Sequence, residues 1–297
     1  MPSPRPVAHL FGAGVACALA GCSGGVLDPH GPVGAAERQV LLNALAIMLV
    51  IVVPTIVAAL AFAWWFRASN PRARRQPHFV YSGRVELVVW SIPLLTILFL
   101  SGVIWVGSHR LDPFQPVSDA KPLEVQVVSL DWKWLFIYPQ QGIATVNELV
   151  VPAGLPVHFS LTSGSVMNAF FVPQLGGMIA TMNGMVTQLH LQADDPGEYY
   201  GQSTQFSGDG FSDMHFVLRA VPPADFQGWL EGARRSTASL DASAYQARAR
   251  QGVEPRPLTF RSADPALFDA IVRQQVPAAA GPQSGRGGPG AIPQTGS

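Results

Sequence analysis

Two long apolar segments dominate the first third of the chain, at residues 40–66 and 87–106. Their few polar or helix-bending interruptions are Asn43, Pro54, Thr55, Ser91, Pro93, Thr96 and Ser101. Each segment reaches the roughly 20 residues that an α-helix needs to cross the hydrocarbon core of a bilayer. The pattern predicts a hairpin of two transmembrane helices over these ranges.

The connecting segment, residues 67–86, is basic. It holds Arg67, Arg72, Arg74, Arg75 and Arg84, and no acidic residue occurs before Glu86. Loops rich in Lys and Arg next to membrane spans remain on the cytoplasmic side. We therefore expect a cytoplasmic loop, with the N-terminus and everything after residue 106 on the extracytoplasmic side.

Beyond residue 123 the pattern changes to short alternating segments. Trp132, Trp134, Phe136 and Tyr138 fall on one side of an extended stretch. Further strand candidates are residues 124–128, 145–151, 157–162, 166–172, 186–192 and 213–218. Pro and Gly turn signals separate them, which favours an antiparallel β-sandwich over residues 123–220.

The remainder of the chain returns to helical patterning. Residues 224–235, 239–250 and 265–275 are predicted as short helices of a C-terminal extension, residues 221–276. Residues 277–297 consist largely of Ala, Gly, Pro, Gln and Ser, a composition typical of a disordered tail.

Composition narrows the functional classes. Hydrophobic residues make up 48% of the 297 residues and charged residues only 13%, as expected for a membrane protein, and the net charge of zero gives no support to nucleic-acid binding. The two cysteines are Cys17 and Cys22. A disulfide framework, and any thiolate metal site beyond residue 22, are therefore excluded.

The N-terminus carries Arg5, an apolar run and then Leu19-Ala-Gly-Cys22, which is typical of a secretory signal. Its ending resembles the lipobox of bacterial lipoproteins. This predicts a signal peptide at residues 1–21, lipidation of Cys22 and an extracytoplasmic segment at residues 22–39. The alternative is an uncleaved anchor in which Cys22 is an ordinary small residue.

Three stretches resemble subunit II of the cytochrome o ubiquinol oxidases, within the haem–copper oxidase subunit II family. They are Val85-Glu-Leu-Val-Val-Trp-Ser-Ile-Pro93, Asp131-Trp-Lys-Trp-Leu-Phe-Ile-Tyr-Pro139 with Gly142–Glu148, and Ser165-Val-Met-Asn-Ala-Phe-Phe-Val-Pro173. The resemblance runs from the lipobox to about residue 275. It implies a membrane-anchored α+β protein, in which a two-helix hairpin precedes an extracytoplasmic cupredoxin-like Greek-key sandwich.

The segment from Tyr200 to Met214 is similar to the stretch that carries a dinuclear copper centre in cytochrome c oxidases, with the pattern Cys-x3-Cys-x3-His-x2-Met. When the segment is aligned with that pattern without a gap, the two cysteine positions fall on Ser203 and Ser207, and the residue that ligates through its backbone falls on Gln205. The histidine position falls on Phe211 and the methionine position on Met214. The position of a further, upstream histidine falls on Asn168. Hydroxyl, amide and benzyl groups cannot replace thiolates and imidazoles as copper ligands. We therefore expect no metal and no other cofactor in this chain.

The resemblance implies a non-redox subunit of a proton-pumping quinol:oxygen oxidoreductase in the aerobic respiratory chain. The quinol would bind to subunit I and pass electrons directly to the haem and copper held there, with no role for cytochrome c. Ubiquinol is the favoured quinol, because the resemblance is to ubiquinol oxidases. The expected partners are subunits I, III and IV and the lipid of the bacterial inner membrane.

Four further features carry hypotheses. Glu86, where the second span begins, is a candidate for proton uptake by resemblance or an ordinary helix-start carboxylate. Trp132 and Trp134 are expected to pack between the sandwich and the membrane subunits. His158, His190 and His215 are interpreted as surface or half-buried imidazoles rather than a mononuclear copper site, and His215 should point away from the face that Met214 occupies.

Two other functions remain for comparison. A copper-containing cytochrome c oxidase subunit II would share the fold but requires Cys at positions 203 and 207. A free-standing lipoprotein that binds a solute would explain the sandwich but not the resemblance through the spans.

Overall fold

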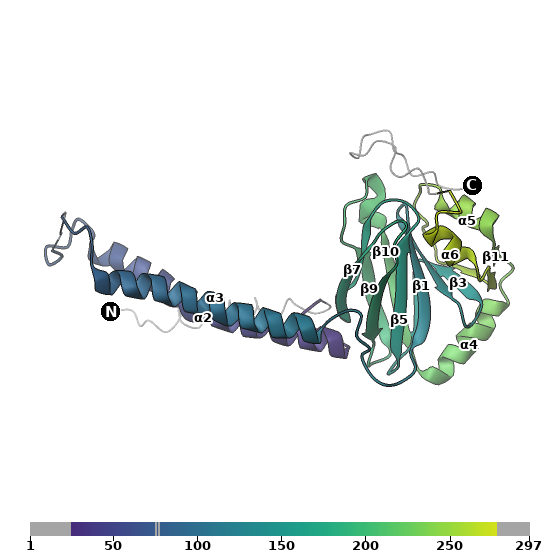
Figure 1. Cartoon of the computed structure of the whole chain (residues 1–297), viewed down its shortest axis with the longest axis horizontal. Coiled ribbons are helices and arrows are strands. Elements are labelled where there is room, and N and C mark those ends of the chain that lie inside the picture. Colours follow the sequence, from purple (N-terminus) through teal and green to yellow (C-terminus); the bar gives the residue numbers. More distant parts are fainter. Residues whose placement is uncertain (1–24, 75, 77, 278–297) are drawn as a thin grey trace, which may run out of the picture. The chain divides into compact units, whose positions relative to one another are not determined.

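The computed structural model describes residues 25–74, 76 and 78–277, which fall into two compact units. The hairpin unit comprises residues 36–112, and the β-domain comprises residues 113–277 together with residues 25–35 (Figure 1). The predicted signal peptide, Cys22 and nearly all of the predicted tail lie outside the described residues.

The hairpin unit consists of two long helices, most of α2 (Pro32–Trp65) and α3 (Gly83–Arg110). Gly107, late in α3, lies against Val40, early in α2, so the helices run antiparallel. Both are long and apolar enough to cross a membrane, and none of the most apolar stretch of either is buried within the protein. Such exposed apolar surface requires a lipid or protein environment.

Both helices extend past the predicted spans 40–66 and 87–106. α2 begins at Pro32, and α3 begins at Gly83 and continues to Arg110. Hydropathy identifies only the part of a helix that is apolar enough to lie in the membrane. The helical hydrogen bonds continue through adjoining residues with good helix propensity, such as Ala35 and Ala36. Proline also fits the first position of a helix, where its missing N–H is not needed.

The two threonines within the spans are hydrogen-bonded inside their own helix. The Thr55 hydroxyl donates to the Ile51 carbonyl at 2.7 Å, and the Thr96 hydroxyl donates to the Ile92 carbonyl at 2.7 Å. Such bonds to the preceding turn remove the cost of an unpaired hydroxyl in hydrocarbon. Pro54 immediately precedes Thr55, and Pro93 lies three residues before Thr96.

The β-domain is a sandwich of two sheets, as predicted (Figure 1). The strands are β1 (Leu123–Leu130), β2 (Lys133–Tyr138), β3 (Ile143–Val146), β4 (Glu148–Pro152), β5 (Pro156–Ser163), β6 (Asn168–Val172), β7 (Gly176–Thr181), β8 (Thr187–Gln192), β9 (Gly197–Ser203), β10 (His215–Val221) and β12 (Leu258–Phe260). The first sheet has the order β12-β3-β2-β1-β5-β8 and the second β4-β10-β9-β6-β7. A separate small sheet pairs β11 (Ser239–Leu240) with β13 (Ser262–Ala263).

The sandwich is mixed rather than wholly antiparallel, which corrects the sequence-based expectation. β1 pairs in parallel with β5, and β4 pairs in parallel with β10. The short turns between successive strands indicated antiparallel neighbours. Strands that are separated by several others in sequence have connections long enough to return in the same direction.

The predicted strand 145–151 is in fact two strands that belong to different sheets. Asn147 lies between β3 and β4 with a left-handed backbone conformation, φ 57°. Its side-chain oxygen accepts from the Trp134 amide at 2.8 Å and its side-chain nitrogen donates to the Glu254 carbonyl at 3.0 Å. Asparagine tolerates this conformation, and its amide anchors the corner at which the chain changes sheet. The strands β7 and β9 were not among the candidates.

The first sheet is covered on both faces, because β2 is buried along its whole length. Trp134 and Phe136 belong to the core between the two sheets, whereas Leu135 and Ile137 belong to a second core. This second core also contains residues of the C-terminal extension such as Tyr245 and Phe268. The extension is therefore an integral part of the β-domain.

The three predicted C-terminal helices are present with shifted ends. They are α4 (Pro223–Arg234), α5 (Ala242–Ala249) and α6 (Leu267–Val272). The predicted start of the second helix, at residue 239, is instead β11, and the helix begins after Asp241, whose carboxylate accepts from the Ala244 amide at 2.8 Å. That contact is a helix N-cap and lowers the pKa of Asp241.

The N-terminal segment before the hairpin is packed on the β-domain. The His30 amide donates to the Gln174 carbonyl at 2.8 Å, and the Gly34 amide donates to the Leu175 carbonyl at 3.0 Å. A Cβ on Gly31 would approach the Gln192 carbonyl oxygen to 2.1 Å, so only glycine fits there. Residues 25–35 thus lie along the loop after β6 and the end of β8.

The buried hydroxyl of Tyr138 generates a stability prediction. It donates to the Val150 carbonyl at 3.0 Å and accepts from the Val150 amide at 2.8 Å, and burial raises its pKa well above the ordinary value. Tyr138→Phe leaves both backbone groups unpaired and should lower the free energy of unfolding by about 1–3 kcal/mol. Urea unfolding of the purified β-domain measures this. Tyr200→Phe, at an exposed side chain, is the matched control and should change stability by less than about 0.5 kcal/mol; equal effects of the two variants would contradict the assignment.

Candidate functional site

The six positions that resemble copper ligands converge at one end of the second sheet. Asn168 begins β6, Ser203 ends β9, and the others lie in the loop that leads through a short 3₁₀ helix (Asp209–Asp213) to β10. Asn168, Ser203, Ser207 and Met214 are buried, Phe211 is half-buried and Gln205 is exposed. The structure therefore brings together the residues that the sequence pattern selected.

These side chains form a hydrogen-bonded cluster. The Ser203 hydroxyl donates to the Asn168 side-chain oxygen at 3.2 Å and lies 3.4 Å from the Gln205 carbonyl. The Ser207 hydroxyl lies 3.9 Å from the Met214 sulfur, and the Ser203 amide donates to the Met214 carbonyl at 3.1 Å. The hydroxyl groups of Ser203 and Ser207 thus find partners among the other selected positions.

The chemistry of this donor set does not fit a copper pair. Neutral hydroxyls and an amide are poor ligands for copper, and one thioether cannot bridge two ions. Throughout the part of the chain that the structure describes, no group of three or more His, Cys, Asp or Glu side chains is placed to hold a metal ion. The side chains at these positions are instead packed and hydrogen-bonded to one another or to nearby backbone groups.

Trp132 contacts the loop that contains Ser207 and Gly210. Its indole N–H donates to the Ser207 carbonyl at 3.0 Å, and a Cβ on Gly210 would approach the same ring to 2.2 Å. Trp132 itself has a left-handed backbone, φ 65°, at the turn between β1 and β2. Glycine at position 210 therefore permits the loop to lie flat on the indole.

The expectation that Trp132 and Trp134 pack against other subunits is wrong. Their side chains are 1% and 0% exposed, inside the β-domain. Trp134 makes edge-on contacts with Phe170 and Phe216, at centroid distances of 5.5 and 5.7 Å. Sequence showed that the aromatic residues share a face, but that face is turned toward the opposite sheet.

The histidines are placed as the favoured interpretation predicted. His215 is exposed and stacks beside Tyr200, whereas its neighbour Met214 is buried on the opposite face. His158 and His190 stack on adjacent strands with ring centroids 4.5 Å apart. His158 Nδ1 lies 2.6 Å from Glu124 Oε2, so this pair is held by a carboxylate.

One buried polar cluster was missed by the sequence analysis. Asp131 accepts a hydrogen bond from the Ser165 hydroxyl, and burial raises the pKa of its carboxyl group. The Lys133 ammonium donates to the Arg248 and Arg250 carbonyls at 2.9 and 2.8 Å, and burial lowers its pKa to about 8. The only available signal was that two charged residues flank Trp132 within an apolar stretch.

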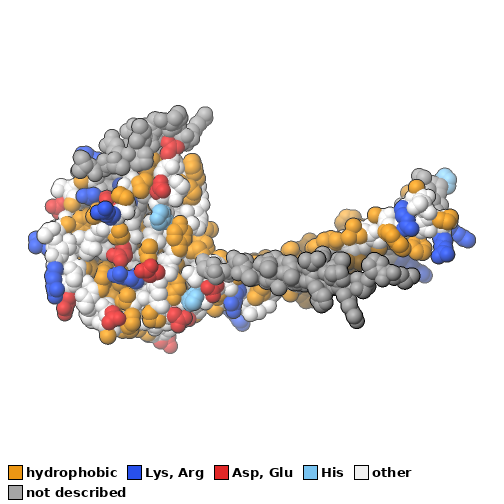
Figure 2. All heavy atoms as spheres, turned by 180° about the vertical axis from the view of Figure 1, so that it is seen from behind, with side chains coloured by type: hydrophobic (Ala, Val, Ile, Leu, Met, Phe, Trp, Pro, Cys, Tyr) orange, Lys and Arg blue, Asp and Glu red, His pale blue; other side chains and the backbone are white. Residues whose placement is uncertain are grey.

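Glu86 lies in the first turn of α3, where the helix dipole favours a carboxylate. The Trp90 indole N–H donates to Glu86 Oε2 at 3.0 Å. The carboxylate is exposed on the hairpin, at the end that carries the arginine-rich loop. Figure 2 shows the basic side chains of that loop gathered at one end of the apolar hairpin.

Comparison with known proteins places the β-domain in a class. The family described as cytochrome C oxidase subunit II, periplasmic domain, matches residues 121–221. The crystal structure of the periplasmic domain of subunit II of cytochrome oxidase (CoxB) of Bradyrhizobium japonicum aligns with 40% of this chain and 98% of that chain, at 24% identity and a TM-score of 0.38. By family match, the sandwich is of the oxidase subunit II class.

Full-length relatives give the family. Ubiquinol oxidase subunit 2 of Acetobacter aceti is 46% identical over 269 residues, which are 90% of this chain and 87% of that protein. Cytochrome bo(3) ubiquinol oxidase subunit 2 of Pseudomonas aeruginosa is 46% identical over 255 residues, 86% of this chain and 77% of that protein. The chain belongs to the ubiquinol oxidase subunit 2 family, the second subunit of the haem–copper quinol oxidases of the respiratory chain.

The cluster generates a prediction about metal binding. The wild-type β-domain should acquire no purple dicopper absorption when incubated with copper, because thiolates and imidazoles are missing. The variant Asn168→His/Ser203→Cys/Ser207→Cys/Phe211→His should acquire it, since Met214 and the Gln205 carbonyl are already in place. Optical absorption and copper content measure the difference.

The matched control for that experiment carries Asn168→His and Phe211→His alone. It supplies imidazoles without thiolates and should remain colourless. A purple centre in the wild-type domain would overturn the interpretation that the site has lost its metal-binding chemistry.

Proposed function

We propose that this chain is a structural, non-redox subunit of its oxidase, through which no electrons pass. The observation that carries the proposal is the hydrogen-bonded cluster of Asn168, Ser203 and Ser207 at the positions of copper ligands. A quinol is lipid-soluble and can reach a membrane-embedded haem without a soluble carrier. Electrons then pass from quinol directly to the haem and copper of subunit I.

The proposed topology places the hairpin across the bacterial inner membrane with residues 67–86 in the cytoplasm. The arginines of the connecting loop support this orientation, since such residues are retained on the cytoplasmic side. The β-domain then lies on the periplasmic side, and Cys22 carries its lipid at the outer surface. The N-terminal segment 25–35, packed on the β-domain, keeps Cys22 on that same side.

Within the complex the chain contributes binding surface. The exposed apolar sides of α2 and α3 are available to the membrane subunits I, III and IV. The β-domain is held together by its own two hydrophobic cores. These properties suit an assembly subunit that covers the periplasmic surface of subunit I.

The first test is the substrate of the intact complex. When the complex is purified in mild detergent, haem and copper should copurify in a larger subunit, and oxygen consumption should respond to a ubiquinol analogue but not to reduced cytochrome c. We expect no response to cytochrome c, because the positions that resemble copper ligands carry no thiolate or imidazole that could form an electron-accepting copper site. Recovery of this chain as a lone polypeptide would instead support a free-standing lipoprotein.

The second test concerns Glu86, which we propose takes part in proton uptake into subunit I. Glu86→Gln preserves the oxygen that accepts from the Trp90 indole but removes the titratable group. If the carboxylate transfers protons, Glu86→Gln and Glu86→Ala should both lower quinol-driven oxygen consumption severalfold at normal assembly.

Trp90→Phe is the control for a purely structural contact. It removes the 3.0 Å hydrogen bond but leaves the carboxylate, and turnover should remain close to that of the wild type. Normal turnover of a fully assembled Glu86→Ala complex would reject the proton-uptake role.

A further inference from the structure

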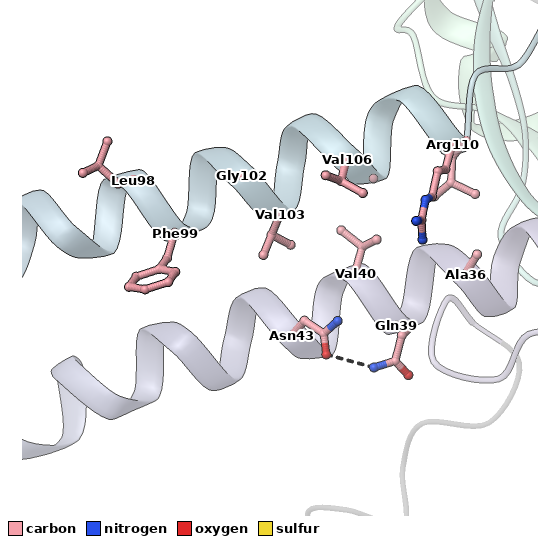
Figure 3. A pocket seen from close by; sticks show the side chains of 12 residues that line it. Ala36, Gln39, Val40, Asn43, Leu98, Phe99, Gly102, Val103, Val106 and Arg110 are labelled. Atoms are coloured by element: carbon pink, nitrogen blue, oxygen red, sulfur yellow. Dashed lines mark hydrogen bonds between the residues drawn. The ribbon is translucent and has the colours of Figure 1, made fainter.

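The hairpin unit contains a groove between its two helices, near the end opposite the basic loop. It has a volume of about 640 Å³ and is lined by α2 from Ala36 to Asn43, by α3 from Leu98 to Arg110, and by Leu111 just after α3 (Figure 3). Gly102 opens it, because a Cβ at this position would meet no atom within 4 Å. At Gly107, by contrast, the helices touch, and a Cβ would approach Val40 to 3.1 Å.

The groove is polar at one end and apolar at the other. Arg110 and Gln39 stand at the end nearest the β-domain in sequence, whereas Leu98 and Phe99 line the interior end. The Gln39 side-chain nitrogen donates to the Asn43 side-chain oxygen at 2.9 Å, which leaves amide N–H groups of Asn43 for a further acceptor. This gradient matches an amphiphile with an anionic head and a hydrocarbon tail.

Arg110 supplies charge complementarity. A basic residue in the last turn of a helix is favoured by the helix dipole, which accounts for its presence. The dipole does not account for the direction of its side chain, which Figure 3 shows extending from α3 toward α2 at the mouth of the groove. No ion-pair partner of Arg110 is found among the residues that the structure describes.

The dimensions agree with one membrane leaflet. From Phe99 to Arg110 the helix rises about 16 Å, close to half of the roughly 30 Å hydrocarbon core. Spread over that length, the volume corresponds to a mean cross-section of about 40 Å². A whole α-helix with its side chains, at a diameter of about 10 Å, needs roughly twice that area.

We propose that this groove binds an acyl chain of an anionic phospholipid in the periplasmic leaflet, with the lipid phosphate against Arg110. The assignment to that leaflet rests on the proposed topology of the hairpin. The lipid fills the space that Gly102 leaves between α2 and α3, and the Asn43 amide faces its ester or phosphate oxygens.

The experiment uses the intact complex reconstituted in vesicles that contain a phosphatidylglycerol with a photoactivatable group in its acyl chain. After irradiation, peptide mass spectrometry locates the adducts. They should concentrate on the groove-lining residues of α2 and α3, and the same probe with a phosphatidylcholine head should label these residues less.

Variants separate the two parts of the site. Arg110→Gln should lower the phosphatidylglycerol adduct about fivefold, the equilibrium factor for about 1 kcal/mol per basic residue at an anionic lipid surface, and Arg110→Lys should retain it. Gly102→Leu fills the groove and should abolish the adduct. Ser101→Leu, an exposed neighbour that does not line the groove, is the matched control and should label like the wild type.

Four outcomes overturn the inference. Adducts spread evenly around both helices would show that no lipid occupies the groove, and so would equal labelling of Gly102→Leu and Ser101→Leu. A phosphatidylglycerol adduct that is unchanged by Arg110→Gln would exclude the anionic head. Adducts that are absent from the groove but present on a neighbouring subunit's helix would show that protein fills it. The haem content of the same preparation tests the proposed function separately, since a chain purified without haem still yields an adduct map.

Discussion

Trp134, Phe170 and Phe216 meet in the space between the two sheets, with ring centroids 5.1 to 5.7 Å apart. Each such pair contributes about 0.5–1.5 kcal/mol beyond the burial of its area. The rings come from β2, β6 and β10, so they join the first sheet to the second. Asn168 begins β6 and Met214 immediately precedes β10, and the geometry of the cluster that contains them therefore follows from this aromatic core.

The loop between β9 and β10 is held in its conformation by hydrogen bonds. The contacts of Ser203 with Asn168, and of the Ser207 carbonyl with the Trp132 indole, are individually worth about 1 kcal/mol. Together with the flat contact of Gly210 on the indole they fix the chain without an ion.

The C-terminal extension depends on a different element, the outward face of the first sheet. Leu135 and Ile137 on this face pack against apolar residues of α5 and α6. The Lys133 ammonium donates to two backbone carbonyls, one in the last turn of α5 and one just after it. Burial of the ammonium is costly, and the two carbonyls together with the nearby Glu254 offset part of that cost. The extension is thus attached by packing and by one buried cation.

The succession of an apolar helical hairpin, a β-sandwich and short C-terminal helices, and the lack of thiolate and imidazole side chains at positions 203, 207 and 211, could be obtained from sequence alone. These features depend on local pattern, since hydropathy, strand alternation and side-chain chemistry are properties of neighbouring residues. The parallel pairing of β1 with β5 and the corner at Asn147 could not, because strand partners are selected by contacts between distant segments. For the same reason only the tertiary structure revealed the burial of Trp132 and Trp134, the buried Lys133 and the groove beside Gly102, each of which depends on which surfaces meet.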